Sequence, residues 1–291
     1  MQSSRYLQLD VFSARIGGGN QLGVVVDAAA WTGGQMQAFA AWTGLVETTF
    51  VLPPAAEASY RLRIFTPSRE IPFAGHPTIG SAHAVLEAGV AQPRQGMLLQ
   101  ECGAGLLPIR VEGDGASRNL FVQAPAARVL REGVDDAPLL RAALGNSALG
   151  ALPPVFVEGG RRWWIAEFAD ESALRRWRPD HAAIGALANA TDSLGLCVFA
   201  RCVNSDYDVV VRAFPAGVGI VEDPASGAAN GLIAAWIAQA EPHGLLARGY
   251  RVSQGREMGH DAAILIRIEQ DQIWVGGSTH TIVSGNVRWP V

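Results

Sequence analysis

Short hydrophobic stretches separated by turn residues follow one another through the first half of the chain. Between them, helical patterns lie at Gly34–Trp42, after the candidate N-cap Thr32, and at Pro77–Ala88. The β-branched and aromatic stretches predict strands at Tyr6–Phe12, Gly23–Asp27, Thr48–Leu52, Tyr60–Phe65, Met97–Glu101, Gly105–Val111 and Asn119–Gln123.

The second half repeats this organisation after a crossover at Ala126–Gly145 that contains a short helix, Pro138–Leu144. Four strand-like stretches close the chain after the apolar helix Ala225–Ala240. Further strands and two short helices are predicted at Val155–Val157, Trp163–Glu167, Glu171–Trp177, His181–Ala188, Leu194–Ala200 and Tyr207–Phe214.

Each half therefore contains many strands and one apolar helix without a polar face. Such a helix must be buried, so each half could wrap its strands around it. The sequence predicts an α+β fold of two domains, 1–126 and 127–291, and the last strand is a candidate to return to the N-terminal half.

An internal repeat connects the two halves. Arg63-Ile-Phe65 and Arg212-Ala-Phe214 each precede a loop, a proline and a small-residue helix. When His76 is placed on Asp223, three further identities fall into register, namely Pro77 on Pro224, Gly80 on Gly227 and Ala82 on Ala229. Duplication explains this pattern better than independent use of the same helix-start residues.

The repeat predicts two matched anion sites. Proline is favoured at the first helical position, and small residues in the next turn leave the free backbone N–H groups open to a ligand. We expect the two helix starts to face one another across a cleft, with His76 and Asp223 pointing into it. The alternative is that Asp223 is only an N-cap and His76 only a turn residue.

Glu47 lies at the start of an apolar strand, in Gly-Leu-Val-Glu47-Thr-Thr-Phe-Val. A solvated charge at a strand end is the ordinary alternative. The apolar neighbours instead favour a partly desolvated carboxylate, whose pKa would be raised into a range that suits proton transfer.

The basic residues exclude several enzyme classes. Lysine is absent, so all 23 basic residues are arginine, and neither Schiff-base chemistry nor a P-loop is possible. The net charge of −4 gives no reason to expect nucleic acid or an anionic membrane as a partner.

The distribution of cysteines, histidines and apolar runs indicates a cytoplasmic protein without a metal. No apolar run is long enough to span a membrane, and the N-terminus lacks the pattern of a signal peptide. Cys102, Cys197 and Cys202 form no disulfide framework, which suits a reducing compartment. The histidines and cysteines have no metal-ligand spacing.

Four segments in this order resemble the PhzF-like family of phenazine-biosynthesis isomerases, which has the diaminopimelate-epimerase-like fold. Together they extend over most of the chain. They are Asp10-Val-Phe with Gly19-Asn20, Glu47-Thr-Thr-Phe-Val, Phe73-Ala-Gly-His76-Pro-Thr, and Gly219-Ile-Val-Glu-Asp223-Pro-Ala-Ser-Gly227.

The resemblance implies two pseudo-symmetric domains, each a curled mixed β-sheet around a central apolar helix. It implies a homodimer that needs no cofactor or metal and isomerises a small anionic metabolite such as trans-2,3-dihydro-3-hydroxyanthranilate. Glu47 would move the proton, while His76 and Asp223 orient the substrate. The implied substrate-binding positions are Asn20, Gly75, Pro77, Thr78, Ser226, Gly227 and Ala228.

Two positions depart from the family pattern. Ala228 stands where the family often has serine, which bears on the identity of the substrate, and Gln21 stands where proline is usual. An epimerase or dehydratase of an amino or hydroxy acid, using the same glutamate, is one alternative. A relative that binds a metabolite without catalysis is the other.

Overall fold

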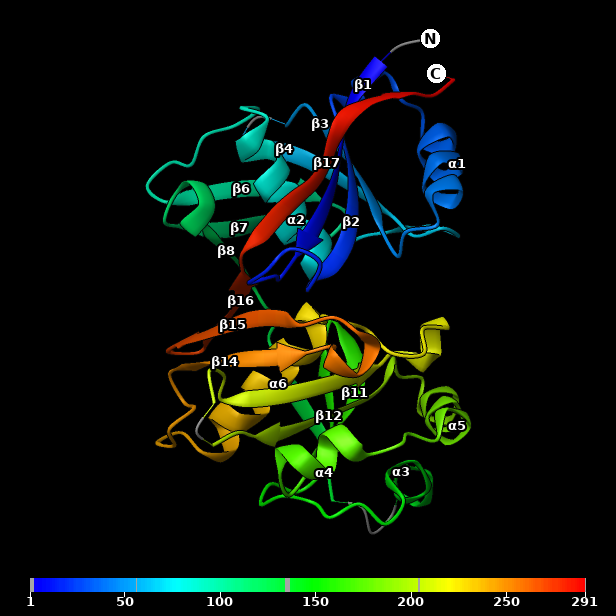
Figure 1. Cartoon of the computed structure of the whole chain (residues 1–291), viewed down its shortest axis with the longest axis vertical. Helices are drawn as coiled ribbons and strands as arrows, with labels where there is room; N and C mark the ends of the chain where they lie inside the picture. The colour runs from blue at the N-terminus through cyan, green and yellow to red at the C-terminus, as the bar shows by residue number, and fades with distance from the viewer. Residues whose placement is uncertain (1–2, 56, 134–136, 204, 291) are drawn as a thin grey trace. The chain divides into compact units, whose positions relative to one another are not determined.

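The chain forms two units, each built around one apolar helix (Figure 1). The computed structural model describes residues 3–55, 57–133, 137–203 and 205–290. The first unit comprises Met1–Gln123 and Gly276–Val291, and the second comprises Ala124–Val275. The division lies close to the predicted one at residue 126, and the last strand belongs to the first unit.

The first unit is a mixed sheet. Its strands are hydrogen-bonded in the order β17, β1, β2, β3, β4, β6, β7 and β8, and only the β2/β3 and β4/β6 pairs are parallel. Their bounds are β1 Ser3–Val11, β2 Asn20–Val26, β3 Thr48–Leu52, β4 Tyr60–Phe65, β5 Glu70–Ile71, β6 Met97–Cys102, β7 Gly105–Glu112, β8 Asn119–Gln123 and β17 Thr279–Arg288.

Helix α2, Gly75–Glu87, is enclosed by this sheet, because it contacts β1, β2, β3, β4, β8 and β17. Its small residues allow the sheet to approach closely. A Cβ atom at Gly80 would lie 2.5 Å from Leu22 Cδ2, which is closer than packed atoms tolerate. Helix α1, Gly33–Thr43, packs instead on β3 and β4 with a cluster around Phe39, and Thr32 forms the predicted N-cap within a capping box.

The second unit has the same sheet order. Strands β9, β10, β11, β12, β13, β14 and β15 pair in sequence, and only β11/β12 and β13/β14 are parallel. The strands are β9 Arg128–Glu132, β10 Val155–Gly159, β11 Arg161–Glu167, β12 Gly195–Arg201, β13 Val209–Phe214, β14 Gly249–Gln254 and β15 Ala262–Glu269. Strand β16, Gln272–Gly277, crosses the division between the units after Val275. The helices are α3 Pro138–Leu144, α4 Glu171–Arg176, α5 His181–Thr191 and α6 Gly227–Ala240.

The two units therefore share one succession of antiparallel and parallel pairs. In both, the buried helix connects the two strands of the second parallel pair, which are β4 and β6 around α2 and β13 and β14 around α6. The predicted fold class and internal repeat are confirmed. Strands β5 and β9 were not predicted; four of the five residues of β9 are exposed, so no hydrophobic alternation marks it.

Candidate functional site

Glu47 and His76 lie together in the first unit. Glu47 directly precedes β3, and His76 is the second residue of α2. The Glu47 Oε2 and His76 Nε2 atoms are 3.5 Å apart, and the two side chains are only 12% and 7% exposed. The carboxyl group is thus partly withdrawn from water, as the sequence predicted for a proton carrier.

Burial controls the charge of His76. It lowers the pKa of the imidazole from 6.5 to about 4, against a smaller raising effect of a hydrogen bond with the Gln21 backbone. His76 is therefore neutral at pH 7, and its contact with Glu47 is one between a carboxyl group and an uncharged imidazole rather than an ion pair. The Nδ1 atom lies 3.5 Å from the Asn20 side-chain nitrogen.

A buried hydrogen bond ties β3, the strand that directly follows Glu47, to α2, the helix that carries His76. The hydroxyl groups of Thr49 on β3 and Ser81 on α2 are 2.8 Å apart, and both residues are completely buried. An unpaired hydroxyl would be costly here, so the pair fixes β3 against α2. No sequence pattern marks either residue, because their partnership depends on the packing of strand and helix.

Asn20 is positioned by the loop that precedes it. The buried carboxylate of Asp10 accepts hydrogen bonds from the N–H groups of Gly17, at 2.7 Å, and Gly19, at 2.9 Å. Charge-assisted bonds of this kind hold a loop firmly. Asp10 thereby fixes the loop so that Asn20 lies beside His76.

The start of α2 leaves first-turn N–H groups without an internal acceptor. The N-cap residue is Ala74, which has no side chain to accept a hydrogen bond, so the N–H groups of Gly75 and His76 lack a cap. Pro77 is the third helical residue rather than the first, which corrects the prediction. Thr78 is fully buried, and its hydroxyl accepts a hydrogen bond from the Gln100 amide.

The second loop precedes α6. Asp223 accepts a hydrogen bond from the N–H of Ala225 at 3.1 Å. Ser226 is the N-cap of α6, and its hydroxyl accepts from the N–H of Ala229 at 3.4 Å. Gly227 and Ala228 open the helix, and Ala228 is exposed. Their first-turn N–H groups have no acceptor within the helix.

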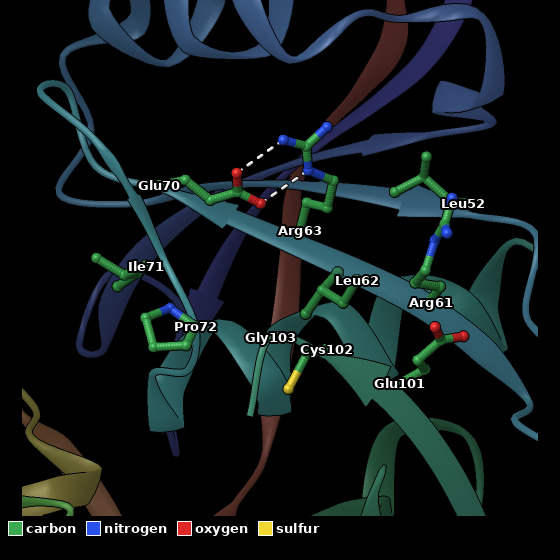
Figure 2. A pocket seen from close by; sticks show the side chains of 10 residues that line it. All are labelled: Leu52, Arg61, Leu62, Arg63, Glu70, Ile71, Pro72, Glu101, Cys102 and Gly103. Atoms are coloured by element: carbon green, nitrogen blue, oxygen red, sulfur yellow. Dashed lines mark hydrogen bonds and ion pairs between the residues drawn. The ribbon is translucent and has the colours of Figure 1, made fainter. Parts of the chain in front are cut away.

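Matched ion pairs show how the two loops correspond. Arg63 of β4 binds Glu70 through two hydrogen bonds of 2.7 Å (Figure 2), and Arg212 of β13 binds Glu222 through bonds of 2.8 and 2.9 Å. Both are two-pronged guanidinium–carboxylate pairs. Glu70 is therefore the counterpart of Glu222.

Backbone pairing gives the same correspondence. Ile64 pairs with Ile71 in the first unit, and Ala213 pairs with Asp223 in the second. Since Ile64 and Ala213 each follow the arginine of the ion pair, Ile71 is the counterpart of Asp223.

A glycine also packs against the loop proline in each unit. A Cβ at Gly103 would lie 2.8 Å from Pro72 Cα, and the two residues are neighbours in Figure 2. A Cβ at Gly255 would lie 2.6 Å from the Pro224 carbonyl oxygen. Pro72, and not Pro77, is thus the counterpart of Pro224.

The register predicted for the repeat, with His76 on Asp223, is therefore wrong. The helix starts coincide at Gly75 and Gly227, so His76 corresponds to Ala228. Pro224 lies before the N-cap and is not at the first helical position either. Small residues recur so often in these segments that several registers match them, and only the tertiary contacts select one.

A depression of about 610 Å³ also lies on the first unit, beside the Arg63–Glu70 pair (Figure 2). Its lining includes Pro72, Cys102 and Gly103 but neither Glu47 nor His76. Within the part of the chain that the structure describes, no three or more histidine, cysteine, aspartate or glutamate side chains are grouped to hold a metal ion. Over the same residues, no helix is both long and apolar enough to cross a membrane.

Comparison with known proteins identifies the family. The sequence profile of phenazine biosynthesis-like proteins matches residues 9–286. The chain belongs to this family. It is 32% identical to the trans-2,3-dihydro-3-hydroxyanthranilate isomerase of Pseudomonas aeruginosa, over 91% of this chain and 90% of that protein. It is also 31% identical to antisense-enhancing sequence 1 of Schizosaccharomyces pombe, over 98% and 99% of the two chains.

The fold agrees with this assignment. A phenazine biosynthesis protein of the PhzF family from Bacillus anthracis superposes with a TM-score of 0.86, over 99% of this chain and all of that one, at 24% identity. The predicted family is confirmed, and so is the prediction of an isomerase, the reaction class that family relatives name.

Proposed function

We propose that this protein isomerises a small cyclic carboxylate by moving one proton between carbon atoms, with Glu47 as the acid and base. The observation that carries the proposal is the pairing of a nearly buried carboxyl group with a neutral imidazole at 3.5 Å. Because the neighbouring His76 is neutral, Glu47 can release and recover a proton without the creation of a second buried charge.

The proposed substrate class follows from the relatives. Three proteins with 31–32% identity to this chain are named trans-2,3-dihydro-3-hydroxyanthranilate isomerase. That compound carries a carboxylate, and uncapped helix starts bind carboxylates through their N–H groups. The N–H groups of Gly75 and His76 in the first unit are suited to this role, and those of Gly227 and Ala228 in the second unit are suited to it independently.

We assign Asp223 of the second unit to substrate as an orienting group, as the resemblance implied. Its carboxylate accepts a hydrogen bond from the N–H of Ala225 on the same loop, and the residue is only partly buried. The reaction is proposed to need no metal or organic cofactor. A homodimer and a cytoplasmic location also remain proposals that derive from the resemblance and the composition.

The test is Glu47→Gln, which keeps the shape of the side chain but cannot carry a proton. Loss of a general acid or base typically costs about 10²–10⁴-fold, so kcat should fall by at least about a hundredfold with little change in ligand affinity. Glu112→Gln on β7 is the matched control, because Glu112 is a half-buried carboxylate with an arginine 4.0 Å away. It should retain the wild-type rate.

Isotope labelling separates an isomerase from the alternatives. With trans-2,3-dihydro-3-hydroxyanthranilate in D₂O, the product should carry deuterium at the carbon that receives the proton, or should carry the substrate's own label if Glu47 is shielded from solvent. Wild-type turnover by the Glu47→Gln variant would refute the assignment. Deuterium uptake at one carbon without a shift of the double bond would indicate an epimerase instead.

A further inference from the structure

One buried side chain, that of Gln254 at the end of β14, forms hydrogen bonds with the Asp223 loop of the second unit. Gln254 is 0% exposed. Its Nε2 donates to the Asp223 carbonyl oxygen at 2.7 Å, and its Oε1 accepts from the Ser226 N–H at 3.3 Å. One amide therefore satisfies backbone groups at both ends of the segment 223–226.

A second amide completes the arrangement. Asn230, also fully buried, donates through Nδ2 to Gln254 Oε1 and to the Ser226 carbonyl oxygen, each at 2.9 Å. The first turn of α6, the loop and the end of β14 thus share one buried hydrogen-bond network. Such networks favour a single geometry, because every broken bond leaves a buried polar group unpaired.

The residue after Gln254 adds a steric constraint. Gly255 has φ +90°, and its backbone packs so closely on Pro224 that a side chain would collide with the proline carbonyl. Two neighbouring residues therefore hold the loop, Gln254 through hydrogen bonds and Gly255 through backbone contact with Pro224. We call this Gln254-Gly255 pair the loop seat.

The first unit lacks the amide at this position. The Pro72–Gly103 and Pro224–Gly255 contacts make Gly103 the counterpart of Gly255, so Cys102 is the counterpart of Gln254. A thiol cannot supply the paired donor and acceptor of an amide. Gln100 of β6 lies two residues before Cys102, and its side chain hydrogen-bonds those of Thr78 and Tyr60 instead. The first unit thus forms the same fold without an amide at this position. The hydrogen bonds of Gln254 are therefore a feature of the Asp223 loop and not a requirement of the shared fold.

We propose that Gln254 is a positioning residue for the isomerisation: it fixes the Asp223 carboxylate and the first-turn N–H groups of α6 in the geometry that the substrate needs. This inference rests on the proposed function, because Asp223 and these N–H groups are assigned there to substrate. Misplacement of reacting groups by about 1 Å can cost about a hundredfold in rate, so loss of the seat should act on kcat.

The main variant is Gln254→Met, which keeps the length of the side chain and removes all three hydrogen bonds. Hydrogen exchange of a peptide covering 223–230 should become at least about tenfold faster, and kcat should fall by about ten- to a hundredfold.

Val252→Ala is the matched control. Val252 lies two residues earlier on β14, on the same face, and is 1% exposed, so its truncation destabilises the same strand without removing a hydrogen bond to the loop. Thermal unfolding should show comparable destabilisation of the two variants. Val252→Ala should nevertheless keep wild-type exchange at 223–230 and wild-type kcat.

Each outcome bears on one claim. If hydrogen exchange of 223–230 is unchanged in Gln254→Met, the amide does not hold the loop. If exchange in Gln254→Met is faster but its kcat equals that of Val252→Ala, the held loop does not serve the reaction. Either result overturns the positioning role. A wild-type protein without isomerase turnover contradicts the proposed function itself, and the positioning role is lost with it because no reaction remains to be positioned.

Discussion

The charge of His76 can be tested without knowledge of the substrate. Burial is the largest cause of its low pKa, which falls from 6.5 to about 4. At about 1.4 kcal/mol per pH unit, this difference corresponds to about 3 kcal/mol of preference for the neutral imidazole in the folded protein. We predict that His76 titrates near pH 4, well below a solvent-exposed histidine.

The sign of the effect on stability follows from linkage. The unfolded chain binds a proton on His76 below about pH 6.5, whereas the folded protein does so only near pH 4. Stability that is present above pH 6.5 is therefore lost as the pH falls toward 4 and is constant below it. Between pH 7 and pH 4.5, wild type should lose about 2–3 kcal/mol more unfolding free energy than His76→Asn.

The assay is NMR titration of the imidazole signals of the six histidines. The signal that disappears in His76→Asn identifies His76. Glu47→Gln should leave the pKa of His76 low, because burial and not the carboxyl group determines it. A His76 signal that titrates near 6.5 would refute the reasoning, since the site would then contain a true Glu47–His76 ion pair near neutral pH.

Two further predictions concern the loop seat and the absence of a cofactor. Gly255→Ala and Gly259→Ala both place a side chain at positive φ, +90° and +82°, but only Gly255 meets the Pro224 carbonyl. In thermal unfolding, Gly259→Ala should lower the unfolding free energy by about 1–2 kcal/mol, and Gly255→Ala should lower it by about 1–3 kcal/mol more. Equal losses would contradict the close packing of Gly255 on Pro224. Isomerase activity should survive exhaustive dialysis against EDTA, and a loss that a divalent cation restores would contradict the proposed chemistry.

Much of the local structure could be predicted from the chain alone, for identifiable reasons. The predicted strands at Thr48–Leu52, Tyr60–Phe65 and Asn119–Gln123 and the helix Pro138–Leu144 have the observed bounds, because turn residues flank clear apolar patterns. The strand β9, Arg128–Glu132, is mostly polar and exposed, and it is stabilised by pairing with β10 rather than by its own pattern.

The sequence by itself determined that two apolar helices had to be buried and that Glu47 stood where a strand begins, since both follow from the order of polar and apolar residues. Only the tertiary structure decided the register of the repeat, the pKa of His76 and the role of Gln254. The contact of Gln254 with Asp223 joins residues far apart in the chain, and the charge of an imidazole depends on what surrounds it. The surroundings of a single polar side chain and its long-range hydrogen bonds are properties of the folded chain, and no local pattern encodes them.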